Sequence, residues 1–340
     1  KRQAEGSMGR AFRGAGMIHS WQEESWTALI RPYPDFAHAF LFLGPEKTGR
    51  QDFVLTFAQS LLCQKNKATK EHLPCRVCQS CRFFAEGTHP DFYRLAIQEE
   101  DPLKINTAVI KIDQIRDISK KIHNTSYLGG NKIIFIYPAD ALNLAAANSL
   151  LKMLEEPPPH TYFLLLVGQR RQLLPTLRSR CQIVHLPRPE EGMALPLVAK
   201  QVGKEKAPAF LALTSGSPFV DPFFPESLHQ DLLLLLAHPK VLTILQFAER
   251  YSKEQKSLDY FLNWLYKWLI DMIALKEGFA IRFYPGQQVM LQQRLSNYSL
   301  KDLWQLADKV AATVPFRFHP LNTRLQIESY LLTYLLNGQR

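Results

Sequence analysis

The stretch HAFLFLGPEKTGRQ (38–51) decides the fold. Residues 38–44 are apolar almost throughout and do not alternate with polar residues, which predicts a strand buried on both faces of a parallel sheet. A tight turn with two glycines follows, and a helical pattern covers residues 50–62. A strand, a loop and a helix in this order are the opening unit of an α/β domain with right-handed crossovers.

Apolar runs of the same kind recur downstream and predict four further strands, at residues 91–97, 132–138, 161–168 and 181–187. Helical patterns separate them, at residues 109–123 and 143–156. The second of these helices is predicted to end before Pro157, because proline lacks the N–H group and restricts the residue before it. The alternation predicts an open α/β sheet covered by helices.

The pattern changes after residue 187, where strand signals stop and leucine-, tyrosine- and tryptophan-rich helical spacing takes over. A proline-rich break at 217–226 divides this part. The sequence therefore predicts a flexible extension at 1–16, an α/β domain at 17–187, a small helical domain at 188–222 and an all-α domain at 223–340.

The composition is that of an ordinary globular protein. Of 340 residues, 46% are hydrophobic and 21% are charged, which argues against a disordered chain. The apolar runs are too short to span a bilayer, and residues 1–16 lack the apolar core of a secretory signal. We therefore expect a cytoplasmic protein. The net charge of +10 suits polyanionic neighbours but does not by itself indicate DNA binding.

Four of the five cysteines form the pattern C-x11-C-x2-C-x2-C, at Cys63, Cys75, Cys78 and Cys81. Two successive C-x2-C steps and one distant thiolate predict a tetrahedral structural zinc site within a module at 63–86. An iron–sulfur cluster also uses four cysteines and stays open as an alternative. His72 and His89 flank the pattern, but four thiolates leave no place for them.

The loop GPEKTGRQ (44–51) resembles a phosphate-binding loop, G-x4-G-K-[ST], in everything but its chemistry. Gly44 and Gly49 are in place. The lysine that would reach the phosphates is replaced by Arg50, and the hydroxyl that would hold Mg²⁺ is replaced by Gln51. Lys47 is in the loop but at the wrong position. We expect a degenerate nucleotide site.

The acids that should accompany such a loop are also missing. In an ATPase of this type, adjacent acids at the end of the third strand hold Mg²⁺ and activate water. The segment KIIFIYPAD (132–140) places Tyr137 and Pro138 there, and Asp140 comes too late. Two independent losses predict weak or no nucleotide binding and no ATP hydrolysis.

The segment at 148–187 closely resembles the clamp-loader subunits of bacterial DNA polymerase III. Within it LLKMLEEPP (150–158) and LRSRC (177–181) are the specific matches, and GTHPDFY (87–93), IDQIRDI (112–118) and the four cysteines fit the same family. The resemblance implies an AAA+-type (RecA-like) domain, a helical lid and a C-terminal collar. The degenerate loop looks like the non-hydrolysing delta prime type, and GSPFV (216–220) lacks the nucleotide-sensing arginine of the tau/gamma type.

Arg180 is the catalytic candidate that the resemblance implies. In the family, the arginine of the Ser-Arg-Cys motif reaches across an interface to the ATP of the neighbouring subunit. A guanidinium suits the charge that spreads over the γ-phosphate oxygens. Arg178 is the nearby alternative, and a salt bridge at the start of the last strand is the structural alternative for Arg180.

The resemblance further implies a hetero-pentamer with tau/gamma and delta subunits. This ring belongs to the DNA polymerase III holoenzyme, a nucleotidyltransferase complex, and loads the sliding clamp onto primer-template DNA. A tau/gamma-like ATPase with an unusual loop is the alternative. A zinc-bearing DNA-binding module, with Arg76 and Arg82 as its basic residues, is a third reading of the same sequence.

Overall fold

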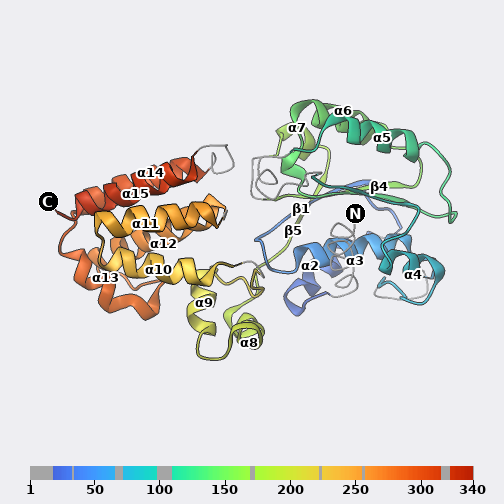
Figure 1. Ribbon diagram of the computed structural model, residues 1–340. Helices are drawn as coiled ribbons and strands as arrows, with labels where there is room; N and C mark the ends of the chain where they lie inside the picture. Colours follow the sequence, from blue (N-terminus) through green and yellow to red (C-terminus); the bar gives the residue numbers. More distant parts are fainter. Residues whose placement is uncertain are drawn as a thin grey trace. The chain divides into compact units, whose positions relative to one another are not determined.

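The computed structural model describes residues 18–32, 34–65, 72–97, 109–168, 173–221, 224–254, 257–314 and 322–339. The predicted extension at 1–16 lies outside these residues. Two compact units, which meet in the sequence at Pro189 and Glu190, make up the chain (Figure 1).

The first unit is built on a five-stranded sheet in which every neighbouring pair of strands is parallel. Its strands are β1 (Ala39–Leu43), β2 (Phe92–Leu95), β3 (Lys132–Ile136), β4 (Thr161–Leu166) and β5 (Gln182–His185). Each lies within the range predicted for it, so all five predicted strands are confirmed. The order is β2-β3-β4-β1-β5, which places β1 between β4 and β5. Ligand sites of open α/β sheets lie at the carboxyl ends of such strands.

Helices cover both faces of this sheet (Figure 1). On one side lie α2 (Glu23–Ile30), α3 (Arg50–Leu62) and α4 (Gln79–Ala85), and on the other lie α5 (Ile112–Ile122), α6 (Leu144–Glu155) and α7 (Pro175–Arg178). Along β1, Phe40 and Phe42 pack toward α3, whereas Leu41 packs toward the opposite core. Both faces are buried, which is why the strand sequences do not alternate. The predicted α/β fold with a parallel sheet is confirmed.

Helix α6 leads toward the site described below. Asn143 caps it by accepting a hydrogen bond from the Ala146 N–H. The helix ends at Glu155, just before the prolines at 157–159, as predicted. Its carboxyl end therefore carries an acidic side chain.

The second unit is helical, with no strand among its described residues. Its helices are α8 (Glu191–Val202), α9 (Ala207–Leu213), α10 (Glu226–Ala237), α11 (Val241–Lys253), α12 (Leu258–Lys276), α13 (Gln288–Leu295), α14 (Leu300–Thr313) and α15 (Thr323–Asn337). Its main core surrounds Trp268 of α12, whose Nε1 donates to the Tyr334 hydroxyl over 3.2 Å. Helices α8 and α9 share a small core of their own. The division between a lid and a collar stays a prediction.

None of the helices in the described ranges combines the length and the hydropathy that a bilayer-spanning helix needs.

Candidate functional site

The loop between β1 and α3 turns at the two glycines that the phosphate-loop pattern shares, and both glycines are required by geometry. At Gly44, a Cβ atom would lie 2.7 Å from the carbonyl oxygen of Leu186, a clash with backbone that cannot move aside. Gly49 adopts a left-handed conformation, φ 76°, directly before α3 begins at Arg50. The glycine spacing in the sequence therefore reflects a real turn at the carboxyl end of β1.

The loop is tied to the segment that precedes the sheet. Thr48 is fully buried, and its hydroxyl donates to the Pro45 carbonyl over 2.8 Å. Its own carbonyl accepts hydrogen bonds from Trp21 Nε1 at 3.2 Å and from Gln22 Nε2 at 3.1 Å. These bonds fix the loop against residues 21 and 22.

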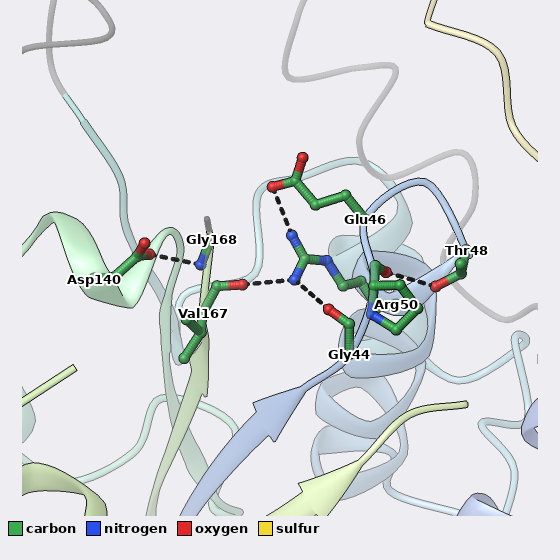
Figure 2. A network of polar contacts seen from close by, with 8 residues as sticks. Gly44, Glu46, Thr48, Arg50, Asp140, Val167 and Gly168 are labelled. Carbon is green, nitrogen blue, oxygen red and sulfur yellow. Dashed lines mark hydrogen bonds and ion pairs between the residues drawn. The ribbon is translucent and has the colours of Figure 1, made fainter. Parts of the chain in front are cut away.

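Figure 2 shows what fills the loop: the guanidinium of Arg50. Its NH1 donates to the Gly44 carbonyl at 3.0 Å and to the Val167 carbonyl at 2.7 Å. Its NH2 lies 2.9 Å from Oε1 of Glu46, which is four residues earlier and belongs to the loop itself. The Arg50 side chain is only 5% exposed. The cation is therefore neutralised inside the protein and links the ends of β1 and β4.

This arrangement removes the chemistry of a phosphate loop. A nucleotide needs a cation that is free to reach the β- and γ-phosphates, and Arg50 is already bound to its own loop. The next residue, Gln51, supplies no hydroxyl for Mg²⁺. The site as it stands can stabilise the fold but offers no free cation at the lysine position.

The residues after β3 also lack the groups that an ATPase of this type uses. Burial raises the pKa of Tyr137, and the nearby Glu46 carboxylate acts in the same direction, so a neutral phenol stands where an ATPase has an acid. Asp140 lies in the 3₁₀ helix η3 (Ala139–Ala141) and is buried. Its Oδ1 accepts the Gly168 N–H over 2.6 Å (Figure 2). A Cβ at Gly168 would lie 2.8 Å from that same oxygen.

Arg180 is placed quite differently. It lies between α7 and β5, and its side chain is 37% exposed. NH2 lies 2.5 Å from Glu155 Oε1 at the end of α6, and NH1 donates to the Thr176 carbonyl at 3.0 Å. The salt bridge that was the structural alternative thus exists, but it leaves the Arg180 side chain partly exposed. Arg178, the other candidate, is also exposed.

The four predicted metal-binding cysteines come together. Their sulfur atoms all lie within 4.8 Å of one another, with 3.9 Å between Cys63 and Cys78 and 4.0 Å between Cys75 and Cys81. A tetrahedron with zinc–sulfur bonds of about 2.3 Å has sulfur–sulfur edges of about 3.8 Å, so the donor set fits Zn²⁺. Backbone N–H groups of Cys75, Cys78 and Cys81 each point at a cysteine sulfur over 3.4 Å.

The acidity of these thiols is uneven without a metal. Burial acts to raise the pKa of Cys75, but N–H groups of Val77 and Cys78 outweigh it and lower that pKa to about 6. Burial raises the pKa of Cys63 and of Cys81. A bound cation is what would hold all four as thiolates.

Neither flanking histidine joins the sulfur cluster among the described residues. Both ring nitrogens of His89 are engaged: Nε2 lies 2.8 Å from Ser80 Oγ, and Nδ1 accepts the Asp91 N–H over 3.1 Å. The cluster lies at the carboxyl end of α3, and Arg50 lies at its start. A helix of 13 residues separates the two by about 20 Å, so the metal site is no part of the degenerate loop.

The chain is similar to proteins named DNA polymerase III subunit delta' from several bacteria. The chain is 38% identical to the Pseudomonas aeruginosa protein over 205 residues and 36% identical to the Escherichia coli protein over 204 residues. It is 30% identical to the Yersinia pestis protein over 290 residues, which cover 81% of both chains. The chain belongs to the delta prime family.

The family described as DNA polymerase III, delta subunit, matches residues 28–190. The first two delta prime relatives match this chain over 59% and 58% of their lengths, in each case 59% of this chain. Among solved structures, a DNA polymerase III gamma subunit-related protein from Thermotoga maritima aligns with 93% of this chain and 99% of its own, at 16% identity and a TM-score of 0.49.

In this member of the delta prime family, the sequence indicated the loop glycines, Arg50, Gln51, Arg180 and the cysteines as candidate site residues, but it did not indicate the partners of Arg50. Glu46 had only a weak signal, an acid four residues before an arginine, because it lies in the turn before α3 and not on a helix. The contact with the Val167 carbonyl could not be predicted, because the acceptor is a backbone oxygen and every residue has one. For Gly168, the only sequence signal of its close approach to Asp140 was that the residue is a glycine.

Proposed function

We propose that this chain is a clamp-loader subunit of DNA polymerase III that does not hydrolyse ATP itself. The observation that carries the proposal is the burial of the Arg50 guanidinium, with its hydrogen bonds to Gly44, Val167 and Glu46 in the space of a phosphate loop. Family membership supports the assignment to the loader. The missing hydroxyl at Gln51 and the missing acids after β3 support the loss of hydrolysis.

Nucleotide binding by the chain alone tests this. We expect no saturable binding of a fluorescent ATP analogue up to about 1 mM in the presence of Mg²⁺. A Kd of about 1 mM corresponds to a binding free energy of about −4 kcal/mol, and the loop lacks the free cation and the Mg²⁺ ligand that would supply it. A tau/gamma-type subunit serves as the positive control. Magnesium-dependent turnover by the chain alone would instead support the tau/gamma-like alternative.

The active contribution of the chain is then Arg180, acting on the ATP of a neighbouring subunit. Its side chain is partly exposed, and a guanidinium matches the charge on transferring phosphoryl oxygens. In this proposal the helices predicted at 223–340 hold the chain in a cytoplasmic ring with tau/gamma and delta subunits. The ring would load the sliding clamp onto primer-template DNA. Co-purification with those subunits, followed by ATPase assays with and without this chain, tests the assembly.

The cysteine cluster is proposed to bind one structural Zn²⁺ through Cys63, Cys75, Cys78 and Cys81. Four thiolates saturate a tetrahedral ion, so it would cross-link the end of α3 to the start of α4 and leave no position for a substrate. Elemental analysis of purified protein should give one zinc per chain. Iron, or folded protein free of metal, would contradict the assignment. Salt-dependent DNA binding by the chain alone would favour the reading as a DNA-binding module.

A further inference from the structure

We infer that Glu155 restrains Arg180 in the free chain and must release it before the arginine can reach a neighbour's ATP. The inference rests on the proposed role of Arg180 in trans. The inference adds Glu155, at the end of α6, as a residue that controls what fraction of Arg180 can bind another anion.

The contacts fold the arginine back onto its own unit. NH1 binds the Thr176 carbonyl, four residues earlier, and NH2 lies 2.5 Å from Glu155 Oε1. The Arg180 side chain therefore lies along the turn that precedes it rather than extending from it. A guanidinium has five N–H donors, and these contacts engage both terminal nitrogens. The two contacts use two of these five donors, so an incoming phosphate has to compete with Glu155 for NH2.

The position of Glu155 supports a role beyond the stability of α6. A carboxylate at the carboxyl end of a helix meets the negative end of the helix dipole, which is locally unfavourable. The next residue, Glu156, is a second acid at the same end, yet the ion pair is made by Glu155. The contact also joins LLKMLEEPP (150–158) to LRSRC (177–181), the two stretches that are most specific in the sequence.

The exposure of the pair makes the restraint reversible. The two side chains are 37% and 49% exposed, and ion pairs of this kind are weak. A triphosphate carries more negative charge than one carboxylate and accepts bidentate hydrogen bonds from a guanidinium, so it can displace Glu155. No covalent step is involved, only a change of the anion that Arg180 binds.

The test is Glu155→Gln in the reconstituted loader. Removing the competing charge raises the fraction of Arg180 that is free, which lowers the apparent KM for ATP by about two- to fivefold and leaves kcat little changed. Glu156→Gln, which removes the neighbouring charge, is the matched control and should have no effect. In an Arg180→Ala background, Glu155→Gln should also have no effect, because its action passes through that arginine.

A second measurement uses the chain alone. Phenylglyoxal, a reagent for accessible arginines, should modify Arg180 faster in Glu155→Gln than in Glu156→Gln, as followed by peptide mass spectrometry. An unchanged modification rate, an unchanged KM or a raised KM would each overturn the inference. If Arg180→Ala by itself leaves ATPase activity intact, the proposed function fails. If Arg180→Ala lowers activity and Glu155→Gln changes nothing, only the restraint fails.

Discussion

Arg50 and Arg180 lie in the same α/β unit, and the sequence motifs around both suggest a role at an ATP site. The two arginines differ in their exposure and in the groups that they bind. Arg50 is 5% exposed, and two of the oxygens it binds are backbone carbonyls. Arg180 is 37% exposed, and its charged partner is a flexible carboxylate. The first cation is part of the fold, and the second is held by an exposed side chain that another anion could replace.

The difference shows that the groups which bind an arginine, more than the motif that contains it, determine whether it can contact another molecule. Backbone carbonyls cannot leave without deforming the strands, so Arg50 is fixed. A carboxylate at a helix end can turn to solvent at little cost, so Arg180 can change partners. Replacement of Arg50 should therefore reduce stability, whereas replacement of Arg180 should reduce ATPase activity of the assembled loader.

The largest expected effect is that of Arg180→Ala on hydrolysis. At the neighbouring ATP site that Arg180 is proposed to complete, loss of the guanidinium should reduce the rate by about 10³-fold. The free energy of unfolding of the chain should change by no more than about 0.5 kcal/mol, because the side chain is exposed. ATPase assays of the reconstituted complex and urea unfolding of the chain measure the two quantities. If Arg178→Ala, the matched control, were the variant that lost activity, the role would belong to Arg178.

Arg50→Ala should show the reverse pattern. It leaves the Gly44 and Val167 carbonyls without their donor and Glu46 without its cation, which should cost about 3 kcal/mol of unfolding free energy. Activity per assembled complex should stay near that of the unaltered chain. Urea unfolding monitored by tryptophan fluorescence measures the loss, and Arg188→Ala, at an exposed arginine, is the control. A variant as stable as the original would show that the network is dispensable.

The five strands were predictable from the sequence because their burial is a property of the local pattern. Phe40 and Phe42 face one core while Leu41 faces the other, so apolar residues fill every position of the strand. The cysteines were predictable for a similar reason. Three of them lie within one short segment, and the fourth, Cys63, ends the helix that this segment packs against.

The role of Arg50 was predictable only in part. The motif indicates that an arginine at the lysine position is the wrong cation for a phosphate loop, and this needs only local reasoning. Its bond to Val167 joins residues 117 positions apart, and the acceptor is a backbone atom. No pattern of residue types records such a contact. The pair between Glu155 and Arg180 is likewise fixed by how α6 packs beside α7.

The helical unit contains a partly buried titratable side chain, His229, whose environment differs from that of Arg50. His229 lies against Trp264 with ring centroids 4.8 Å apart, and its Nε2 has no hydrogen-bond partner among the described residues. Burial lowers the pKa of His229 to about 4, with a smaller opposing effect of Glu226. Since the unfolded chain binds the proton more tightly, stability falls as the pH drops below about 6.5.

Between pH 7.5 and pH 5 this group alone should remove about 2 kcal/mol of unfolding free energy. His229→Phe keeps an aromatic ring and cannot be protonated, so its stability should fall less over the same range. Urea unfolding of both proteins at the two pH values isolates the effect from that of other acidic or metal-binding groups. Equal losses in both proteins would place the acid sensitivity elsewhere.

The smallest expected effect is the most direct test of the comparison. The double variant Arg50→Lys, Gln51→Thr restores the residue types of a phosphate loop. A lysine is a single charge and cannot reach Gly44, Val167 and Glu46 together, so we expect a loss of about 1 kcal/mol. Glu46 stays beside the new cation, and the acids after β3 are still missing, so ATP binding should remain undetectable up to about 1 mM. Micromolar binding by this variant would mean that the motif, rather than the partners around it, governs the site.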